Sequence, residues 1–279
     1  MALTAQELRA VALIGAGDVD LAWGRTGRAR DRYQHALALR EALAAAEPEN
    51  TTYRRDVALG LDRLADLAVA RGDVVVARDL FERSQELREA LAAAEPENTT
   101  YRRDVALGLT RLADLAVARG DVAVARDLVE RSQQLREALA AAEPENTTYR
   151  RGVALGLTRL ADLAVARGDV VVARDLLERS QKLSEALAAA EPENTTYRRD
   201  VALGLTRLAD LAAARGDVVV ARELLARPQK LSEALAAAEP ENTTYRRGVA
   251  LGLTRLADLA AALSESVGGR GTGEHHVPA

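Results

Sequence analysis

The residues with the most binding chemistry in this chain recur every 48 positions, as an arginine, a threonine or aspartate, and an aspartate. The five sets are Arg55, Asp62 and Asp66; Arg103, Thr110 and Asp114; Arg151, Thr158 and Asp162; Arg199, Thr206 and Asp210; and Arg247, Thr254 and Asp258. Steps of seven and four residues place the side chains of a set on one face of a helix. Such a face can hold an extended or helical peptide segment by charge-assisted hydrogen bonds. We therefore predict ladders of partner-binding residues, and the alternative is a solvated face that binds nothing.

Residues suited to catalysis or to metal binding are few. The histidines are His35, in a helical pattern, and His275 and His276 near the C-terminus, and the chain has no cysteine. An active site is a single constellation of titratable groups in a pocket, and near-identical copies do not supply one. The histidine pair could hold a metal only weakly, because an unstructured segment does not preorganise the ligands. We expect no enzyme activity, no cofactor and no metal site.

The elements that position the ladder residues come from an internal repeat. The segment Glu-Pro-Glu-Asn-Thr-Thr-Tyr-Arg-Arg begins at Glu47, Glu95, Glu143, Glu191 and Glu239, each start 48 residues after the last. Residues 95–142 and 143–190 differ at only five positions. A fixed period of this size indicates stacked copies of one supersecondary unit.

Each unit has the pattern of two antiparallel helices. In residues 47–94, Asn50 supplies an N-cap for the first helix. Apolar residues then recur at steps of three and four until Gly72, which can take a positive φ just after the helix end. Asp73 is expected to cap the second helix, which runs toward the next proline, Pro96.

This pattern resembles the signature of the tetratricopeptide repeat (TPR) family. The matching residues are Leu61, Leu64, Ala65, Ala68, Gly72, Asp73, Ala77, Phe81 and Ser84. A unit of that family has about 34 residues. The surplus here divides into about seven residues on each side of Pro96, which is about two helical turns for each helix. Both helices are therefore longer while the packing register is kept, as in elongated bacterial repeats of this type.

The resemblance implies an all-α, right-handed superhelical α-solenoid of antiparallel helix pairs, whose first helices line a concave groove. We expect one TPR-like solenoid over residues 1–265, with hairpins at 4–46, 51–94, 99–142, 147–190 and 195–238, a terminal helix at 243–264 and a disordered tail at 266–279. The implied function is a non-catalytic scaffold for protein–protein interaction. The alternative is a sensor or regulatory arm of a bacterial signalling protein, since similar arrays are joined to NTPase or protease-like modules.

Composition narrows the class of partner. A net charge of -4 with interspersed signs gives no basic face for nucleic acid. No stretch is apolar enough to span a membrane, and a lipid-surface helix would show a lysine-rich face that this chain lacks. The absence of cysteine and of a signal-peptide pattern favours the cytoplasm. The expected partner is a protein or peptide, and the near-identity of the five sets favours a repetitive or promiscuous ligand.

Three features depart from a plain helical pattern. Gly60, Gly108, Gly156, Gly204 and Gly252 lie inside first helices. There each costs up to about 1 kcal/mol relative to alanine, so we expect a neighbouring helix to approach closely. Pro228 stands in mid-helix where three other units have serine, at positions 84, 132 and 180, and this predicts a bend. The helix from Thr243 has no second helix after it, so its open apolar face predicts a homodimer through this end.

Overall fold

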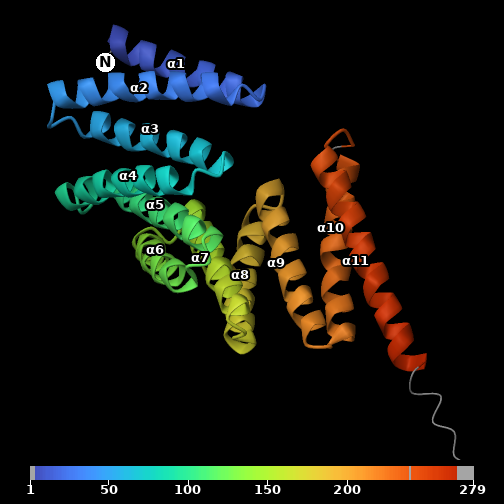
Figure 1. The fold of residues 1–279 in the computed structure, drawn as a ribbon. Coiled ribbons are helices and arrows are strands. Elements are labelled where there is room, and N and C mark those ends of the chain that lie inside the picture. Colours follow the sequence, from blue (N-terminus) through green and yellow to red (C-terminus); the bar gives the residue numbers. More distant parts are fainter. Residues whose placement is uncertain (1–3, 239, 269–279) are drawn as a thin grey trace, which may run out of the picture. The chain divides into compact units, whose positions relative to one another are not determined.

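The computed structural model describes residues 4–238 and 240–268, which form eleven α-helices and no strand. The helices are α1 (Ala5–Ala22), α2 (Thr26–Ala46), α3 (Thr51–Ala70), α4 (Val74–Ala94), α5 (Thr99–Ala118), α6 (Val122–Ala142), α7 (Thr147–Ala166), α8 (Val170–Ala190), α9 (Thr195–Ala214), α10 (Val218–Ala238) and α11 (Thr243–Gly268). Figure 1 shows them in chain order. The chain is thus an all-α repeat of helix pairs, as the sequence predicts.

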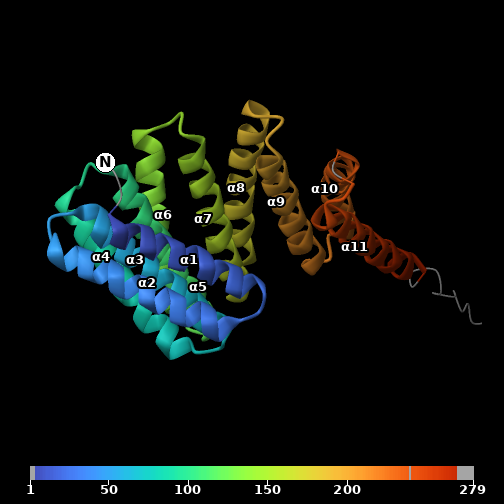
Figure 2. The ribbon, with the colours of Figure 1, turned by 90° about the horizontal axis from the view of Figure 1, so that it is seen from above.

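The residues divide into two compact units, 1–142 and 143–279. In the first unit α1 packs on α2, α3 on α4 and α5 on α6, and each second helix also packs on the first helix of the next pair. In the second unit α7 packs on α8, α9 on α10, and α8 and α10 pack on the following helices, α9 and α11. Figures 1 and 2 show these neighbours side by side within each unit. The single solenoid over 1–265 stays a prediction.

Local capping chemistry sets the ends of the helices. The side chain of Asn50 accepts a hydrogen bond from the backbone N–H of Tyr53, and the equivalent asparagines of α5, α7 and α9 do the same for their helices. Gly72 has a φ of 78°, in the left-handed region, and so closes the turn between the two helices. The prediction that the Asp73 side chain caps α4 is wrong. It makes no capping hydrogen bond, because its carboxylate instead forms an ion pair with Arg71 at 3.5 Å.

The small residues of the repeat allow the two helices of a pair to pack closely. Ala65 on α3 and Ala77 on α4 have no exposed surface, and Phe81 is buried beside them. A second cluster joins neighbouring pairs, with Tyr33 of α2 against Leu61 of α3. Burial of apolar surface in such clusters is the main stabilising term of the helix pairs.

The interior glycines lie where a neighbouring helix approaches closely, which confirms that prediction for four of the five. A Cβ added to Gly108 or Gly204 would lie 2.0 or 2.2 Å from the Oε1 atom of Gln85 or Gln181, on the preceding second helix. At Gly60 the obstacle is Leu37, and at Gly252 it is the corresponding glutamine. Close contact between neighbouring pairs therefore offsets the low helix propensity of glycine.

A hydroxyl group links the two helices of three successive pairs. Ser84, Ser132 and Ser180 donate to the backbone carbonyls of Ala58, Ala106 and Ala154, at 2.7 to 2.9 Å. Pro228 replaces this serine in α10, and the helix continues through it from Val218 to Ala238. The fifth pair therefore lacks the serine hydroxyl, and a bend at Pro228 stays a prediction.

The last helix is longer than the sequence pattern suggests. α11 runs to Gly268, so residues 266–268 belong to the helix and not to the expected tail. The polar residues near position 264 are compatible with a helix, and no proline interrupts them before residue 278. The rest of the expected tail, 269–279, lies outside the described residues.

Candidate functional site

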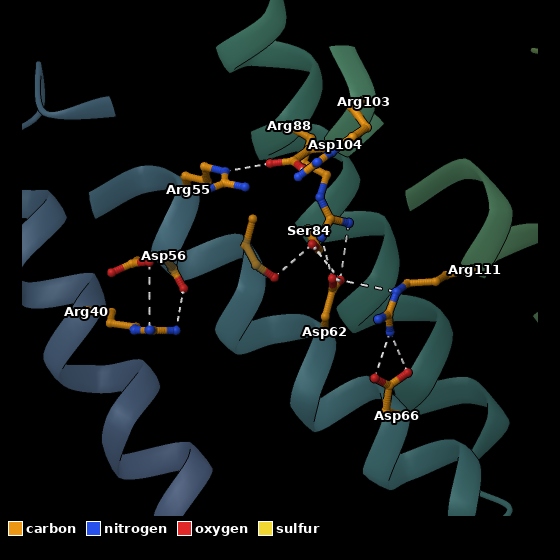
Figure 3. A network of polar contacts seen from close by, with 11 residues as sticks. Arg40, Arg55, Asp56, Asp62, Asp66, Ser84, Arg88, Arg103, Asp104 and Arg111 are labelled. Carbon is orange, nitrogen blue, oxygen red and sulfur yellow. Dashed lines mark hydrogen bonds and ion pairs between the residues drawn. The ribbon is translucent and has the colours of Figure 1, made fainter. Parts of the chain in front are cut away.

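The arginines of the predicted ladder fall into two groups. Nε of Arg55 on α3 lies 2.5 Å from the Asp104 carboxylate on α5, and Nε of Arg151 on α7 lies 2.5 Å from Asp200 on α9. Figure 3 shows Arg55 extended toward Asp104. The hydrogen bond to each aspartate raises the pKa of the arginine. These two cations thus hold neighbouring pairs together.

The other arginines of this row are more open. Half of the Arg103 side chain is exposed, and its nearest carboxylate, Asp104, lies 3.8 Å away. Arg199 and Arg247 are exposed. The described residues bring no carboxylate within ion-pair distance of Arg199. The predicted row is therefore not uniform, because two of its five members, Arg55 and Arg151, hold neighbouring helix pairs together.

The middle row lies largely inside the helix pairs. Asp62, Thr110 and Thr158 are buried, Thr206 is half-buried, and Thr254 is exposed. The hydroxyls of Thr110 and Thr158 donate to backbone carbonyls one turn earlier and lie 3.1 and 2.9 Å from the serine of the paired helix. These threonines stabilise the pair and do not present their hydroxyls to a ligand.

The aspartates of the third row are exposed. Three of them pair with arginines that the predicted ladders do not include. Arg111 donates to Asp66 at 2.6 Å, Arg207 lies 3.1 Å from Asp162, and Arg255 lies 3.4 Å from Asp210. Asp114 and Asp258 are exposed as well. The arginine of each pair lies 45 residues after the aspartate, so these contacts connect successive first helices. Repetition of arginine at this position every 48 residues is the signal that could have revealed them.

An apolar row, also missed, runs along the same face. It consists of Val11, Leu59 and Leu107 in the first unit, and Leu155, Leu203 and Leu251 in the second. Leu107 is 43% exposed and Leu203 is 46% exposed, although both are large aliphatic side chains. Each leucine of the row lies four residues after an arginine of the ladder and four residues before a second arginine, so the leucine and its two arginines share one helix face. A cavity of about 520 Å³ in the first unit is lined by Val11, Ile14, Leu59, Asp62, Asp66 and three arginines.

A buried ion pair lies beneath this face in the first unit (Figure 3). The Asp62 carboxylate is held by the Arg88 guanidinium and accepts a hydrogen bond from Ser84 Oγ at 2.8 Å. Arg88 is 2% exposed and Asp62 is 4% exposed. Nε of Arg111 lies 3.8 Å from the same carboxylate. In the next pair a threonine takes the place of Asp62, and its hydroxyl accepts from Arg136 at 2.8 Å.

The part of the chain that the structure describes has few features of other kinds of site. No group of three or more histidine, cysteine, aspartate or glutamate residues there is placed to hold a metal ion. No helix in that part is long and apolar enough to cross a membrane.

Comparison with known proteins identifies the fold. No protein-family model and no curated protein sequence matches the chain. Among solved structures, BtubC (BKLC) from P. vanneervenii is 16% identical, with a TM-score of 0.53 over 99% of this chain and 96% of that chain. A Podosopora anserina protein with nearly identical TPR-like repeats is 19% identical, with a TM-score of 0.56 over 85% of this chain and 99% of that one.

A further similar structure is the apo form of RapI, 10% identical, with a TM-score of 0.61 over 92% of this chain and 84% of that chain. Identities this low inform on the fold alone. The helix pairs, the Gly-Asp turns and the small buried residues at the signature positions agree with these comparisons. The chain has the TPR-like helical-repeat fold.

Proposed function

We propose that this protein is a non-catalytic scaffold that binds segments of partner proteins on the face formed by its first helices. The observation that carries the proposal is the apolar row of half-exposed side chains between two rows of charge. Burying a fully exposed leucine contributes about 1.5–3 kcal/mol, so a row of half-exposed leucines supports binding once a partner covers it. The fold alone does not specify a function. The chemistry of this surface is the more direct argument for binding.

The Arg–Asp pairs give this face polar groups that can contact a ligand. Exposed ion pairs contribute little to stability, about 0–1 kcal/mol each, so their presence at successive first helices is not explained by folding alone. Side chains of this kind can exchange an internal partner for a polar group of the ligand. An apolar stripe flanked by such groups is typical of a surface that binds an amphipathic segment.

Photochemical crosslinking tests the position of the binding face. A photoreactive phenylalanine analogue placed at Leu107 or Leu203 should form covalent adducts with partner proteins in an extract of the cells that produce the chain. The matched control positions are Glu82 and Glu178, which are about half exposed on second helices. Adducts should be several times more abundant from the two leucine positions, because only they lie on the proposed face. Equal yields from all four positions would refute the proposal.

The open end of the array carries a second proposal, a homodimer through α11. Leu253 is 52% exposed there, whereas its equivalents in complete pairs are 1 to 3% exposed, namely Leu61, Leu109, Leu157 and Leu205. Among the described residues no second helix covers this face of α11. A second copy of the chain could bury it in an interface of like surfaces.

Sedimentation equilibrium tests the homodimer. The chain should dimerise with rising concentration, and Leu253→Asn should weaken the association about tenfold or more, because it places an amide in an apolar contact. Leu203→Asn serves as a control, since this half-exposed leucine lies on the binding face and not at the open end. A strict monomer at high concentration would remove the proposal.

A further inference from the structure

The two arginines that flank each leucine of the apolar row have different surroundings. On α5, Arg103 precedes Leu107 by four residues and Arg111 follows it by four. Arg111 is satisfied by Asp66, with two contacts of 2.6 and 2.7 Å to its carboxylate. Among the described residues of the first unit, the ion pair of Arg103 is the distant one of 3.8 Å to Asp104, whose carboxylate is already bound by Arg55. The apolar row in the first unit thus has a neutralised flank and a flank with a largely unsatisfied cation.

The second unit repeats this asymmetry. On α9, Arg199 and Arg207 flank Leu203 at the same spacing. Arg207 lies 3.1 Å from Asp162, whereas Arg199 is exposed, and no carboxylate of the described residues lies within ion-pair distance of it. The same distribution of charge occurs in both units. The open arginine beside the leucine therefore does not result from the placement of a single side chain.

A substitution in the repeat accounts for the unsatisfied arginine in the second unit. The residue after the ladder arginine is aspartate at positions 56, 104 and 200, but glycine at 152 and 248. Asp200 supplies the carboxylate that holds Arg151, from 49 residues further along the chain. The residue at the same distance from Arg199 is Gly248, which has no side chain to offer. The sequence therefore removes an internal partner from Arg199 and leaves its guanidinium for another group.

We propose that the partner segment carries an acidic row beside its apolar row, and that this acidic row contacts Arg103 in the first unit or Arg199 in the second. This inference rests on the proposed function and adds the chemistry and orientation of the ligand. Carboxylates suit the site because a guanidinium offers paired N–H donors that match both oxygens. A basic row in the same place would meet a like charge, and on the opposite flank Asp66 and Asp162 are already paired with arginines.

Three synthetic peptides test the inference by fluorescence anisotropy with the full chain. Each is an amphipathic helix of about 20 residues, or roughly 30 Å, with the same leucine stripe and with one flank of glutamate, glutamine or lysine. We expect the glutamate peptide to bind about tenfold or more tightly than the lysine peptide, with the glutamine peptide between them. The preference should weaken with added salt, because both charged groups are exposed.

Variants then locate the preference. Arg103→Ala together with Arg199→Ala should reduce the affinity for the glutamate peptide about tenfold, and should leave the affinity for the glutamine peptide within about twofold. Arg179→Ala is the matched control, because Arg179 is an equally exposed arginine on the second helix α8. Loss of affinity in this control, or no loss in the double variant, would overturn the assignment.

Gly248→Asp gives an independent test that keeps every arginine. The new carboxylate would stand toward Arg199 as Asp200 stands toward Arg151, and aspartate already occupies the equivalent helical positions 56, 104 and 200. In the Arg103→Ala background, Gly248→Asp should lower the affinity for the glutamate peptide about as much as Arg199→Ala does in the same background. Unchanged affinity would show that Arg199 does not contact the acidic row.

The peptides also separate this inference from the proposed function. If the glutamine peptide binds and Leu107→Asn with Leu203→Asn abolishes its binding, the binding face stands. Equal affinity of the glutamate and lysine peptides in that case would overturn only the acidic row. If no peptide binds and crosslinking shows no preference for the leucine positions, both proposals fail together.

Discussion

Replacing Arg88 by serine should lower the free energy of unfolding of the α3–α4 pair by about 3–5 kcal/mol, since it leaves a buried charge without its partner. The Asp62 carboxylate is 4% exposed, and its remaining contacts would be Ser84 and, at 3.8 Å, Arg111. Native-state hydrogen exchange of the α3 and α4 amides measures the change locally.

The repeats themselves provide the controls for this prediction. Asp62→Thr should cost less, because Thr110 already accepts a hydrogen bond from Arg136 at 2.8 Å in the next pair. The double variant Asp62→Thr, Arg88→Ser reproduces the threonine and serine found at positions 158 and 184, and should recover most of the lost stability. Arg78→Ser, which removes an exposed ion pair, should change stability by at most about 1 kcal/mol. If the double variant is no more stable than Arg88→Ser, the buried charge is not the cause.

Most of the fold could be predicted from the sequence because its signals are local and repeated. Asn50 caps a helix through its own side chain, and Gly72 takes a backbone conformation that other residues avoid. These features depend on a few neighbouring residues. The prediction that the Asp73 side chain caps a helix was wrong because a second local contact competes with the cap. Arg71 lies equally near and pairs with the Asp73 carboxylate.

The candidate site was harder to predict because it depends on contacts between repeats. Thr110 looks like a surface residue until the register of α5 against α6 brings Ser132 opposite it. Leu107 has the same residue type as the core residue Leu109, and its 43% exposure follows from the packing of the helices around α5. The change from aspartate to glycine after the ladder arginines, at positions 152 and 248, is visible in the sequence. Its meaning requires the contact between Arg55 and Asp104, which are 49 residues apart.

Pro228→Ser should stabilise the last complete helix pair, α9 with α10, by about 3 kcal/mol or more. Proline in α10 cannot donate a backbone hydrogen bond to the carbonyl of Leu224, and its ring crowds that turn. Serine would restore the donor. Its hydroxyl would also be placed like that of Ser180, which donates to the carbonyl of Ala154 at 2.8 Å. Hydrogen exchange of the α9 and α10 amides, with thermal unfolding followed by circular dichroism, measures the gain.

Pro228→Ala separates the two contributions to this gain. Alanine restores the backbone donor and removes the ring but supplies no hydroxyl, so it should fall short of serine by the about 0.5–1.5 kcal/mol of one hydrogen bond. The carbonyl of Ala202, the expected acceptor, already accepts from Thr206 at 2.8 Å. A carbonyl oxygen has two lone pairs, and the equivalent carbonyl of Ala154 accepts from both Thr158 and Ser180. No gain from either variant would show that α10 accommodates Pro228 without strain, and it would remove the basis for a bend there.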